Sequence, residues 1–308
     1  MNNPRTDLSS QCCSVIALVG ETNAGKSTLL NTLVGSKLAI VTPKVQTTRT
    51  LLRGIVMAGQ TQLIFVDTPG IFTPKRGLEK SMVKTAWSGM DSGDTILLLI
   101  DSHRGITPHL NTILEGIENR VKRGGVRAIA VLNKTDSITP EKLLPLAAAL
   151  GEKNIFEQVF MISGLTGDGV DDVKNYLAEG APKQPWMFPE DQITDAPMRF
   201  IAAEITREKL FMKLRQELPY SLMVETEKWE ERPVSKTEPA GGVKIHQAIV
   251  VERESHKKIV LGKGGGTIRA VGEEARKDLE RMLSQHVHLF LFVKVRENWQ
   301  DDTSNLTL

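Results

Sequence analysis

Residues 20 to 28 read Gly-Glu-Thr-Asn-Ala-Gly-Lys-Ser-Thr, and this stretch decides the fold of the first half of the chain. It follows the apolar run Ser14–Val19 and precedes a helix-like segment that begins at Lys26. The order is strand, glycine loop, helix, and the loop matches G-x-x-x-x-G-K-[ST]. Gly20 and Gly25 permit a close backbone approach, so that successive N–H groups can point at phosphate oxygens. A glycine turn without a ligand is the alternative, and the segments that follow favour the phosphate loop.

Two side chains at the end of this loop have expected tasks. Lys26 would reach the β and γ phosphates, and Ser27 would hold Mg²⁺. The N-terminus of the following helix adds a dipole that favours anions. We therefore expect a nucleoside triphosphate with Mg²⁺ at this position.

The composition is that of a globular protein of about two domains. The chain has 308 residues, of which 40% are hydrophobic and 25% charged. Its two cysteines, Cys12 and Cys13, are adjacent, which fits buried thiols in a reducing compartment better than a disulfide or metal site. No apolar run approaches the ~20 residues that span a bilayer, and residues 1–11 lack the character of a secretory signal or transit peptide. We expect a cytoplasmic protein.

The segment after the first helix is a candidate switch loop. Residues 36–50 are small, polar and proline-containing, and they include Gln46-Thr47-Thr48-Arg49. A threonine here can close on Mg²⁺ when the γ-phosphate is present, and we favour Thr48 over Thr47. Two strands, 51–57 and 62–66, follow as a hairpin, and the second runs into Asp67-Thr68-Pro69-Gly70. Asp67 is expected to bind Mg²⁺ through water, and the Gly70 N–H to reach the γ-phosphate.

The remainder of the first half alternates helices with apolar strands. Helices are expected at 78–90, 108–121 and 170–177, and strands at 95–101, 126–132 and 158–162. This alternation predicts an α/β fold with a mainly parallel sheet. In such sheets ligands bind at the carboxyl ends of the strands.

One of these strands ends in Asn133-Lys134-Thr135-Asp136, a pattern suited to guanine. The Asp136 carboxylate can accept from both N1–H and the exocyclic amine of guanine, a pair that adenine does not present, while Lys134 packs along the purine ring. Ser163-Gly164-Leu165 follows the last strand, where a Ser-Ala-x loop would support the base. The nucleotide is therefore predicted to be GTP, bound by a P-loop GTPase domain over residues 12–180.

The predicted GTP-binding residues are Gly20, Glu21, Thr22, Asn23, Ala24, Gly25, Lys26, Ser27, Thr28, Asp67, Thr68, Pro69, Gly70, Ile71, Asn133, Lys134, Thr135, Asp136, Ser163, Gly164 and Leu165. The catalytic candidates are Lys26, Thr48 and Gly70, and the metal candidates are Ser27, Thr48 and, through water, Asp67; Thr48 comes from the switch loop, outside the set of GTP-binding residues.

A proline-containing linker, 181–196, separates this domain from a second one at 197–300 and a tail at 301–308. The second domain is expected to have a helix over 198–216, strands at 220–229 and 243–252, a helix over 267–283 and a strand at 287–295. The loop Gly262-Lys263-Gly264-Gly265, set between helices and flanked by lysines, is the signature of a KH domain, here of type II. Such a loop lets an RNA backbone approach while an apolar groove holds unpaired bases.

The net positive charge of the second domain also supports the prediction that this domain binds RNA. Residues 244–296 hold eleven Lys or Arg and six Asp or Glu, a net charge of +5 that leaves −3 for the rest of the chain. A glycine turn on a solvated basic surface is the plainer alternative, but the order of elements favours single-stranded RNA. The predicted RNA-binding residues are Lys257, Lys258, Gly262, Lys263, Gly264, Gly265, Arg269, Arg276 and Lys277.

The two halves together resemble the Era family of bacterial GTPases over nearly the whole chain. Beyond the nucleotide motifs, the stretches that carry the resemblance are Gln46-Thr47-Thr48-Arg49, Phe188-Pro189-Glu190-Asp191-Gln192-Ile193-Thr194-Asp195, Glu208-Lys209-Leu210, Glu217-Leu218-Pro219-Tyr220-Ser221, Glu273-Glu274-Ala275-Arg276-Lys277-Asp278 and Val287-His288-Leu289.

The resemblance implies binding to the 3′ end of the small-subunit (16S) ribosomal RNA, a role in 30S subunit assembly under control of the GTP state, and peripheral contact with the inner membrane. We expect a monomer. Two positions depart from the family pattern, where proline is common at Thr22 and alanine at Gly164.

Hydrolysis needs a water aligned with the γ-phosphate, and the group that would orient it is not evident. The position after Gly70 holds the apolar Ile71 where Ras-type enzymes carry glutamine, so we expect slow intrinsic turnover. Asn23 raises the hypothesis of a K⁺ ion at the phosphates, with a loop-stabilising role as the alternative. A nucleotide-sensing RNA chaperone without significant turnover is the rival function; a tRNA-modifying GTPase would need a further domain.

Overall fold

The computed structural model describes residues 10–44, 47–74, 77–234 and 241–299. The chain divides into two compact units, one formed by the residues up to Leu38 and Thr48–Asp195, the other by Ala39–Thr47 and the residues from Ala196. The short segment 39–47, which lies inside the predicted first domain, thus groups with the second unit. The predicted domain boundaries remain predictions, and the predicted tail at 301–308 lies outside the described residues.

The first unit is a six-stranded sheet in the order β2-β3-β1-β4-β5-β6. Its strands are β1 (Cys12–Gly20), β2 (Leu52–Ala58), β3 (Thr61–Asp67), β4 (Thr95–Asp101), β5 (Arg127–Asn133) and β6 (Val159–Ile162). Only β2 runs antiparallel, paired to β3 through a hairpin, and the other described pairings are parallel. β4 is buried on both faces, as its unbroken apolar sequence predicts.

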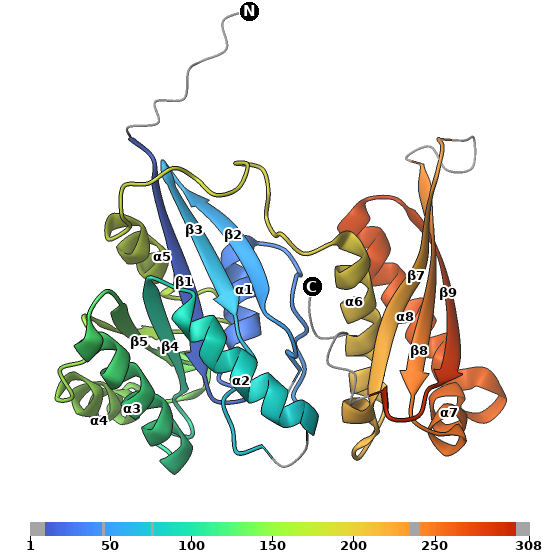
Figure 1. The fold of residues 1–308 in the computed structure, drawn as a ribbon, viewed down its shortest axis with the longest axis horizontal. Helices are drawn as coiled ribbons and strands as arrows, with labels where there is room; N and C mark the ends of the chain where they lie inside the picture. Colours follow the sequence, from blue (N-terminus) through green and yellow to red (C-terminus); the bar gives the residue numbers. More distant parts are fainter. Residues whose placement is uncertain (1–9, 45–46, 75–76, 235–240, 300–308) are drawn as a thin grey trace, which may run out of the picture. The chain divides into compact units, whose positions relative to one another are not determined.

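Helices cover both faces of this sheet (Figure 1). The helices α2 (Gly77–Asp91), α3 (Pro108–Arg123) and α4 (Pro140–Gly151) share one core with β1, β4 and β5. The helices α1 (Lys26–Val34) and α5 (Val170–Glu179) pack together against β1, β2 and β3 on the other side. The prediction of an α/β fold with a mainly parallel sheet is therefore confirmed.

Helix α4 was not predicted. Its sequence carries Pro145 inside the helix, which interrupts a helical pattern, whereas Pro140 stands at the first turn where proline is tolerated. Leu143 and Leu150 bury its inner face and compensate for the unfavourable residue. Tertiary packing rather than local propensity decides this helix.

The predicted linker runs along the edge of the first unit. The Trp186 indole N–H donates to the Gln60 carbonyl at 3.0 Å, and the Gln62 side-chain oxygen accepts from the N–H groups of Met187 and Phe188 at 2.9 and 3.0 Å. Arg53 pairs with Asp195 at 2.5 Å. The aromatic residues of the linker are thus anchored at the β2–β3 hairpin.

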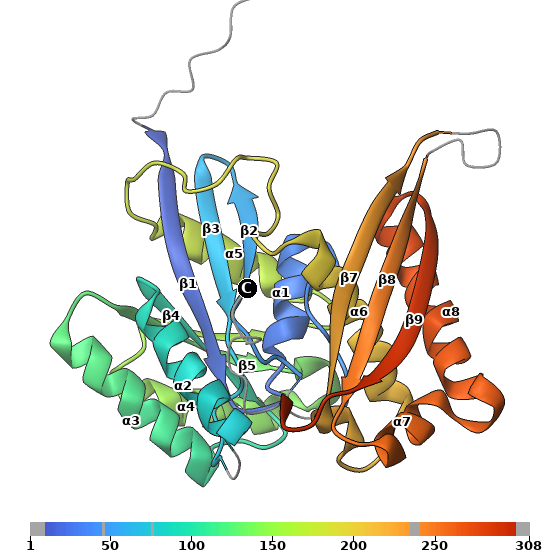
Figure 2. The same ribbon diagram turned by 45° about the vertical axis from the view of Figure 1, so that its right-hand side comes forward.

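The second unit is a three-stranded sheet with helices on one face (Figures 1 and 2). Its elements are α6 (Met198–Lys213), β7 (Leu222–Arg232), β8 (Gly242–Val251), α7 (Glu254–Leu261), α8 (Gly266–Leu283) and β9 (His286–Val295). β7 and β8 are antiparallel, and β8 and β9 are parallel. This helix–strand–strand–helix–helix–strand order confirms the predicted type II KH fold.

Within the described ranges, every helix is too short or too polar to cross a lipid bilayer.

Candidate functional site

The glycine loop of the first unit adopts the conformation that a phosphate cradle requires. Gly25, which precedes α1, has φ of 101°, and a Cβ there would stand 2.1 Å from the Asn133 side-chain nitrogen. Both observations explain why glycine is needed at this position. The loop therefore brings backbone N–H groups to the N-terminus of α1, next to the carboxyl end of β5.

Lys26 is held inside this loop. Its side chain is 6% exposed, and Nζ donates to the carbonyls of Gly20 and Glu21 at 3.2 and 3.0 Å. Burial lowers the pKa of Lys26 to about 8, opposed by the negative charges of Asp67 and Glu21. The ammonium is thus positioned at the loop by carbonyl groups of the loop itself.

Three oxygen-bearing side chains converge beside it. The Ser27 hydroxyl donates to Asp67 Oδ2 at 2.7 Å, Thr48 Oγ1 donates to the same oxygen at 3.2 Å, and the two hydroxyl oxygens lie 3.0 Å apart. Of the two neighbouring threonines, the structure brings Thr48 to this cluster.

The cluster fits a magnesium ion. Asp67 is fully buried, and its second oxygen, Oδ1, has no hydrogen-bond partner among the described residues. Burial raises the pKa of Asp67, while Lys26, Ser27 and Thr48 oppose that rise. A buried carboxylate oxygen without a donor, beside two hydroxyls, is the set of hard oxygen ligands that Mg²⁺ prefers.

Gly70 and Ile71 lie against the glycine loop. The Ile71 N–H donates to the Gly20 carbonyl at 3.2 Å, and the Thr68 hydroxyl donates to the Leu18 carbonyl at 2.7 Å. A Cβ at Gly70 would stand 2.9 Å from the backbone nitrogen of Thr22. The strand end that carries Asp67 is therefore fastened to the phosphate loop.

Asn133 joins three loops. Its side-chain N–H donates to the Ala24 carbonyl at 2.8 Å, and its side-chain oxygen accepts from the Gly164 N–H at 2.8 Å. It is 2% exposed. Asn133 therefore acts as a positioning residue that fixes the phosphate loop against the predicted base-binding loops.

The side chains predicted to select guanine lie at the carboxyl ends of β5 and β6. Asp136 Oδ1 accepts from the Ser163 hydroxyl at 2.7 Å, which orients the carboxylate. Lys134, with φ of 70°, pairs through Nζ with Asp101 at 2.7 Å. Leu165 is 74% exposed. The structure thus brings the predicted residues 133–136 and 163–165 together.

Sequence reasoning missed three residues at this edge, Asp101, Arg104 and Thr107. Asp101 pairs with Lys134, and Arg104 donates to the Thr22 carbonyl at 3.3 Å. The Thr107 hydroxyl donates at 2.8 Å to the carboxylate of Glu21, one of the predicted GTP-binding residues. Asp101 had a usable signal, because it ends an apolar strand as Asp67 does.

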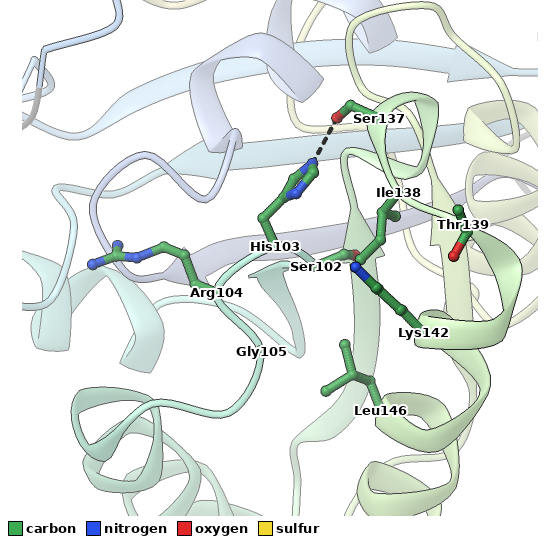
Figure 3. Close-up of a pocket in the computed structure, with 9 residues that line it drawn as sticks. All are labelled: Ser102, His103, Arg104, Gly105, Ser137, Ile138, Thr139, Lys142 and Leu146. Atoms are coloured by element: carbon green, nitrogen blue, oxygen red, sulfur yellow. Dashed lines mark hydrogen bonds between the residues drawn. The ribbon is translucent and has the colours of Figure 1, made fainter.

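A cavity of about 360 Å³ lies next to the residues predicted to select the base. The imidazole of His103 and the Ser137 hydroxyl are 2.7 Å apart across it, and Figure 3 shows Lys142 reaching from α4 while Arg104 points away. The lining residues are Ser102, His103, Arg104, Gly105, Ser137, Ile138, Thr139, Lys142 and Leu146.

In the second unit, the predicted RNA loop connects α7 to α8. Gly262 has φ of 72°, and a Cβ there would stand 2.2 Å from the Thr267 hydroxyl oxygen, so glycine is required. Lys258, Lys263 and Arg269 are exposed around the loop and form no ion pair within the described parts of the chain.

The other predicted cations of this surface are paired on their own helices. Lys257 lies 3.9 Å from Glu254, Arg276 lies 2.9 Å from Glu280, and Lys277 lies 2.8 Å from Glu273. The predicted RNA residues therefore separate into unpaired cations near the glycine loop and cations partly neutralised by a neighbour.

Comparison with known proteins places both halves in one family. A sequence profile described as 50S ribosome-binding GTPase matches residues 15–134, and a KH domain profile matches residues 217–300. The chain is 57% identical to GTPase Era of Sinorhizobium medicae over 93% of its length and 89% of that protein. It is 53% identical to GTPase Era of Bradyrhizobium diazoefficiens, over 94% of the chain and 91% of that protein. The chain belongs to the Era family of GTPases.

Two solved Era structures match the fold as well. One is Era of Aquifex aeolicus bound to GDP·AlF₄⁻, with a TM-score of 0.87, and the other is Era in complex with MgGDPNP and nucleotides 1506–1542 of 16S ribosomal RNA, with a TM-score of 0.86. Each solved structure is 37% identical in sequence to this chain, and each match covers 96% of this chain and 97% of the solved one.

The stretch Glu208-Lys209-Leu210, one of those on which the predicted resemblance rests, has a structural explanation within the second unit. Glu208 accepts from the Val41 N–H at 3.1 Å, Lys209 pairs with Asp278 of α8 at 2.5 Å, and Leu210 is fully buried in the core. These residues hold segment 39–47 and fasten α6 to α8.

Segment 39–47 has two further attachments in the second unit. The Lys44 ammonium donates to the carbonyls of Phe211 and Leu214 at the end of α6. Arg207, 2% exposed, donates to the Thr47 carbonyl at 2.5 Å and pairs with Glu204. The next residue, Thr48, belongs to the first unit and to the oxygen cluster at Asp67.

Proposed function

We propose that this Era-family GTPase binds the single-stranded 3′ end of small-subunit ribosomal RNA and acts in assembly of the 30S subunit, with bound GTP controlling the attachment. The observation that carries the proposal is the Era complex with MgGDPNP and 16S nucleotides 1506–1542, which matches both units of this chain over 96% of its length. Lys258, Lys263 and Arg269 around the Gly262 loop, which have no ion-pair partner among the described residues, would supply the phosphate contacts that such an RNA needs.

For the nucleotide, we propose the site predicted from the sequence. Asp136, oriented by Ser163, accepts from guanine, and Lys134, steadied by Asp101, packs against the ring. Lys26 and the backbone N–H groups of residues 20–28 hold the phosphates. Ser27, Thr48 and Asp67 would hold Mg²⁺, which supplies positive charge to the developing negative charge on the phosphates.

Among the described residues, the side chains named above would position and stabilise the phosphates, and the position after Gly70 holds an apolar side chain that cannot orient the attacking water. Ile71 is buried, and its N–H is bonded to the glycine loop. We therefore expect slow intrinsic turnover, as suits a switch. The nucleotide-sensing chaperone is the second candidate, and measured phosphate release above the rate in buffer would exclude it.

Control by GTP would use segment 39–47. Thr48 would close on Mg²⁺ when the γ-phosphate is present, whereas Thr47 is bonded to Arg207 in the unit that carries the RNA loop. A movement of Thr48 on binding or loss of Mg²⁺ would therefore move the adjoining segment 39–47, which is bonded to α6. This covalent continuity is the physical route by which nucleotide state and RNA binding can be coupled.

Crosslinking the protein to cellular RNA, with and without a non-hydrolysable GTP analogue, tests the proposal. We expect contacts concentrated near the 3′ end of the small-subunit RNA and dependent on the analogue. Contacts dispersed over messenger RNAs would contradict it.

We also propose K⁺ as a second cation at the phosphates, on the basis of Asn23, which has φ of 64° within the loop. Hydrolysis would then be faster in K⁺ than in Na⁺ at equal ionic strength. Equal rates would leave Asn23 a loop-stabilising residue.

The cellular context completes the proposal: a monomer in the cytoplasm, with peripheral contact at the inner membrane. Support for these points is the family membership alone. Analytical ultracentrifugation and fractionation of cell extracts in low and high salt test them. A stable dimer, or absence from the membrane fraction at low salt, would contradict the corresponding part.

A further inference from the structure

The cavity of about 360 Å³ beside the predicted base-binding loops has no task in the proposed function. Its lining comes from the loop after β4, the loop after β5 and the N-terminal half of α4, and includes none of the predicted GTP-binding residues. A volume of this order is within the range of small-molecule sites. The polar groups that line the cavity therefore need an explanation of their own.

One of these groups is a buried hydroxyl without a partner. Ser102 is 3% exposed, and its Oγ has no hydrogen-bond partner among the described residues. The backbone N–H of Ser102 donates to the Asn133 carbonyl at 3.1 Å, which holds this residue at the carboxyl ends of β4 and β5. A buried hydroxyl that bonds nothing is destabilising. An acceptor atom of a ligand in the cavity would supply the missing partner.

A lysine without a carboxylate partner lines the same cavity. Lys142 lies in the first turn of α4 and is exposed, and it forms no ion pair within the described parts of the chain. Figure 3 shows its side chain extending from α4 toward the loop after β4, which carries Ser102. A cation and an unpartnered hydroxyl therefore border one space from two different elements.

The carboxylates nearest to these two residues in sequence are engaged elsewhere. No Asp or Glu is among the described residues that line the cavity. Asp101 accepts from Lys134 Nζ at 2.7 Å and from the His103 backbone N–H at 3.0 Å, so both of its oxygens are bonded. Hydrogen bonds from its own backbone N–H and from the Thr139 hydroxyl lower the pKa of Glu141. The ammonium charge is therefore not balanced by the lining of the cavity.

We propose that this cavity is a binding site for a small phosphate ester, whose phosphate pairs with the Lys142 ammonium and accepts from the Ser102 hydroxyl. A phosphate group carries three strong acceptor oxygens around one centre, so it can meet donors from two elements at once. The apolar side chains of Ile138 and Leu146, which also line the cavity, would contact the carbon part of the ester.

The cavity is connected to the loop predicted to select the base. Ser137 ends the short 3₁₀ helix η2 (Thr135–Ser137), directly after Asp136. Its hydroxyl donates to the Lys134 carbonyl at 3.2 Å and lies 2.7 Å from His103 Nε2. A ligand in the cavity would hold these bonded loops in place, so we expect it to tighten the binding of guanine nucleotides. This coupling rests on the proposed guanine site, whereas the phosphate site itself does not.

Calorimetric titration of ribose 5-phosphate into the full-length protein tests the site. The protein is first saturated with Mg²⁺ and a non-hydrolysable GTP analogue, so that the phosphate loop is filled. We expect ribose 5-phosphate to bind, and ribose, which lacks the phosphate, not to bind. Lys142→Ala should weaken binding about ten-fold, because a charged hydrogen bond is lost, and Ser102→Ala about three-fold. The matched control is Lys153→Ala, which removes an exposed charge just after α4 and should change nothing.

Thermal unfolding separates a ligand-binding role of Ser102 from a structural one. Because its hydroxyl bonds no described residue, Ser102→Ala should leave the melting temperature unchanged. A clear loss of stability would show that the hydroxyl serves the fold, and would overturn its assignment to a ligand.

The coupling is measured as the affinity for GDP with and without saturating ribose 5-phosphate. We expect about five-fold tighter GDP binding in the wild type and no change in Ser137→Ala, which should still bind the ester. Weaker GDP binding would mean that the ester competes at the phosphate loop, and would overturn the coupling. Failure of GDP itself to bind would contradict the proposed guanine site and leave the comparison of Lys142→Ala with the wild type unaffected.

Four results would overturn the phosphate-ester site. The first is that ribose 5-phosphate does not bind, and the second is that wild type and Lys142→Ala bind it equally. The third is that gluconate or inorganic phosphate binds as tightly, which would assign the cavity to a carboxylate or to the free anion. The fourth is that Lys142→Ala changes the affinity for RNA while none of these small molecules binds, which would assign the lysine to RNA.

Discussion

The nucleotide site and the RNA loop are built on opposite physical principles. Lys26, Asp67 and Asn133 are 6% exposed or less, and each is bonded to backbone or side chains of its own unit. Around Gly262 the cations are exposed and unpaired within the described chain. The first arrangement is suited to selecting one ligand through preorganised polar groups, whereas the second is suited to attracting a polyanion through charges that add nearly independently.

The largest effect is expected at Lys26. Lys26→Ala should lower GTP hydrolysis at least 100-fold, because a preorganised positive group at the phosphates is lost. It also removes the charge that opposes the raised pKa of the buried Asp67 carboxyl. Phosphate release measured at saturating GTP checks this, with Lys153→Ala on the surface as control. A rate equal to that of the wild type would mean that the chain senses GTP without turning it over.

The second largest effect is expected on the selectivity for guanine when Asp136 is changed. Asp136→Asn retains the hydrogen bond from Ser163 but replaces a double acceptor, so GTP affinity should fall about 100-fold through loss of charged hydrogen bonds. Xanthosine nucleotides should gain affinity, since the new amide N–H can donate to the added oxygen. Competition against a fluorescent GDP measures both. Asp171→Asn, an exposed change on α5, is the matched control, and a similar loss there would indicate a nonspecific effect.

A smaller effect should appear in the coupling between the two sites. Arg207→Ala and Lys44→Ala each release part of segment 39–47 from α6. The ratio of RNA affinities with a GTP analogue and with GDP should then fall toward one, by up to about ten-fold. RNA titrations in the two nucleotide states give the ratio. If both variants keep the wild-type ratio, another contact transmits the nucleotide state.

The smallest effects are expected on RNA affinity when single cations near the Gly262 loop are removed, and they should differ between cations with and without an ion-pair partner among the described residues. Lys258→Ala, Lys263→Ala and Arg269→Ala should each weaken RNA binding several-fold and reduce the salt dependence by about one ion. Arg276→Ala and Lys277→Ala should do less, because Glu280 and Glu273 already balance those charges. Titrations at several salt concentrations test this. Equal losses at all five positions would remove the distinction.

Sequence by itself determined the chemistry of each half. The phosphate loop, the Asp136 motif and the Gly262 loop are short, because a few adjacent backbone and side-chain groups must meet one ligand. The alternation of helices and apolar strands predicted the sheets, since periodicity is a local property. Helix α4 was not predicted, because Pro145 interrupts the local helical pattern, whereas the burial of Leu143 and Leu150 stabilises the helix in the folded protein.

Tertiary structure decided which distant residues meet. Asn133 bonds to the loop after β1 and the loop after β6, Asp101 pairs with Lys134, and Arg207 of α6 bonds to Thr47. The bonded residues Asn133 and Ala24, Asp101 and Lys134, and Arg207 and Thr47 are 33 to 160 positions apart in the sequence. The stacking of the His246 ring on the Phe290 ring likewise requires β8 and β9 to pair in this parallel register. Such contacts depend on the packing of whole elements, so a local pattern can at most indicate a candidate residue, as the strand end at Asp101 does, and not its partner.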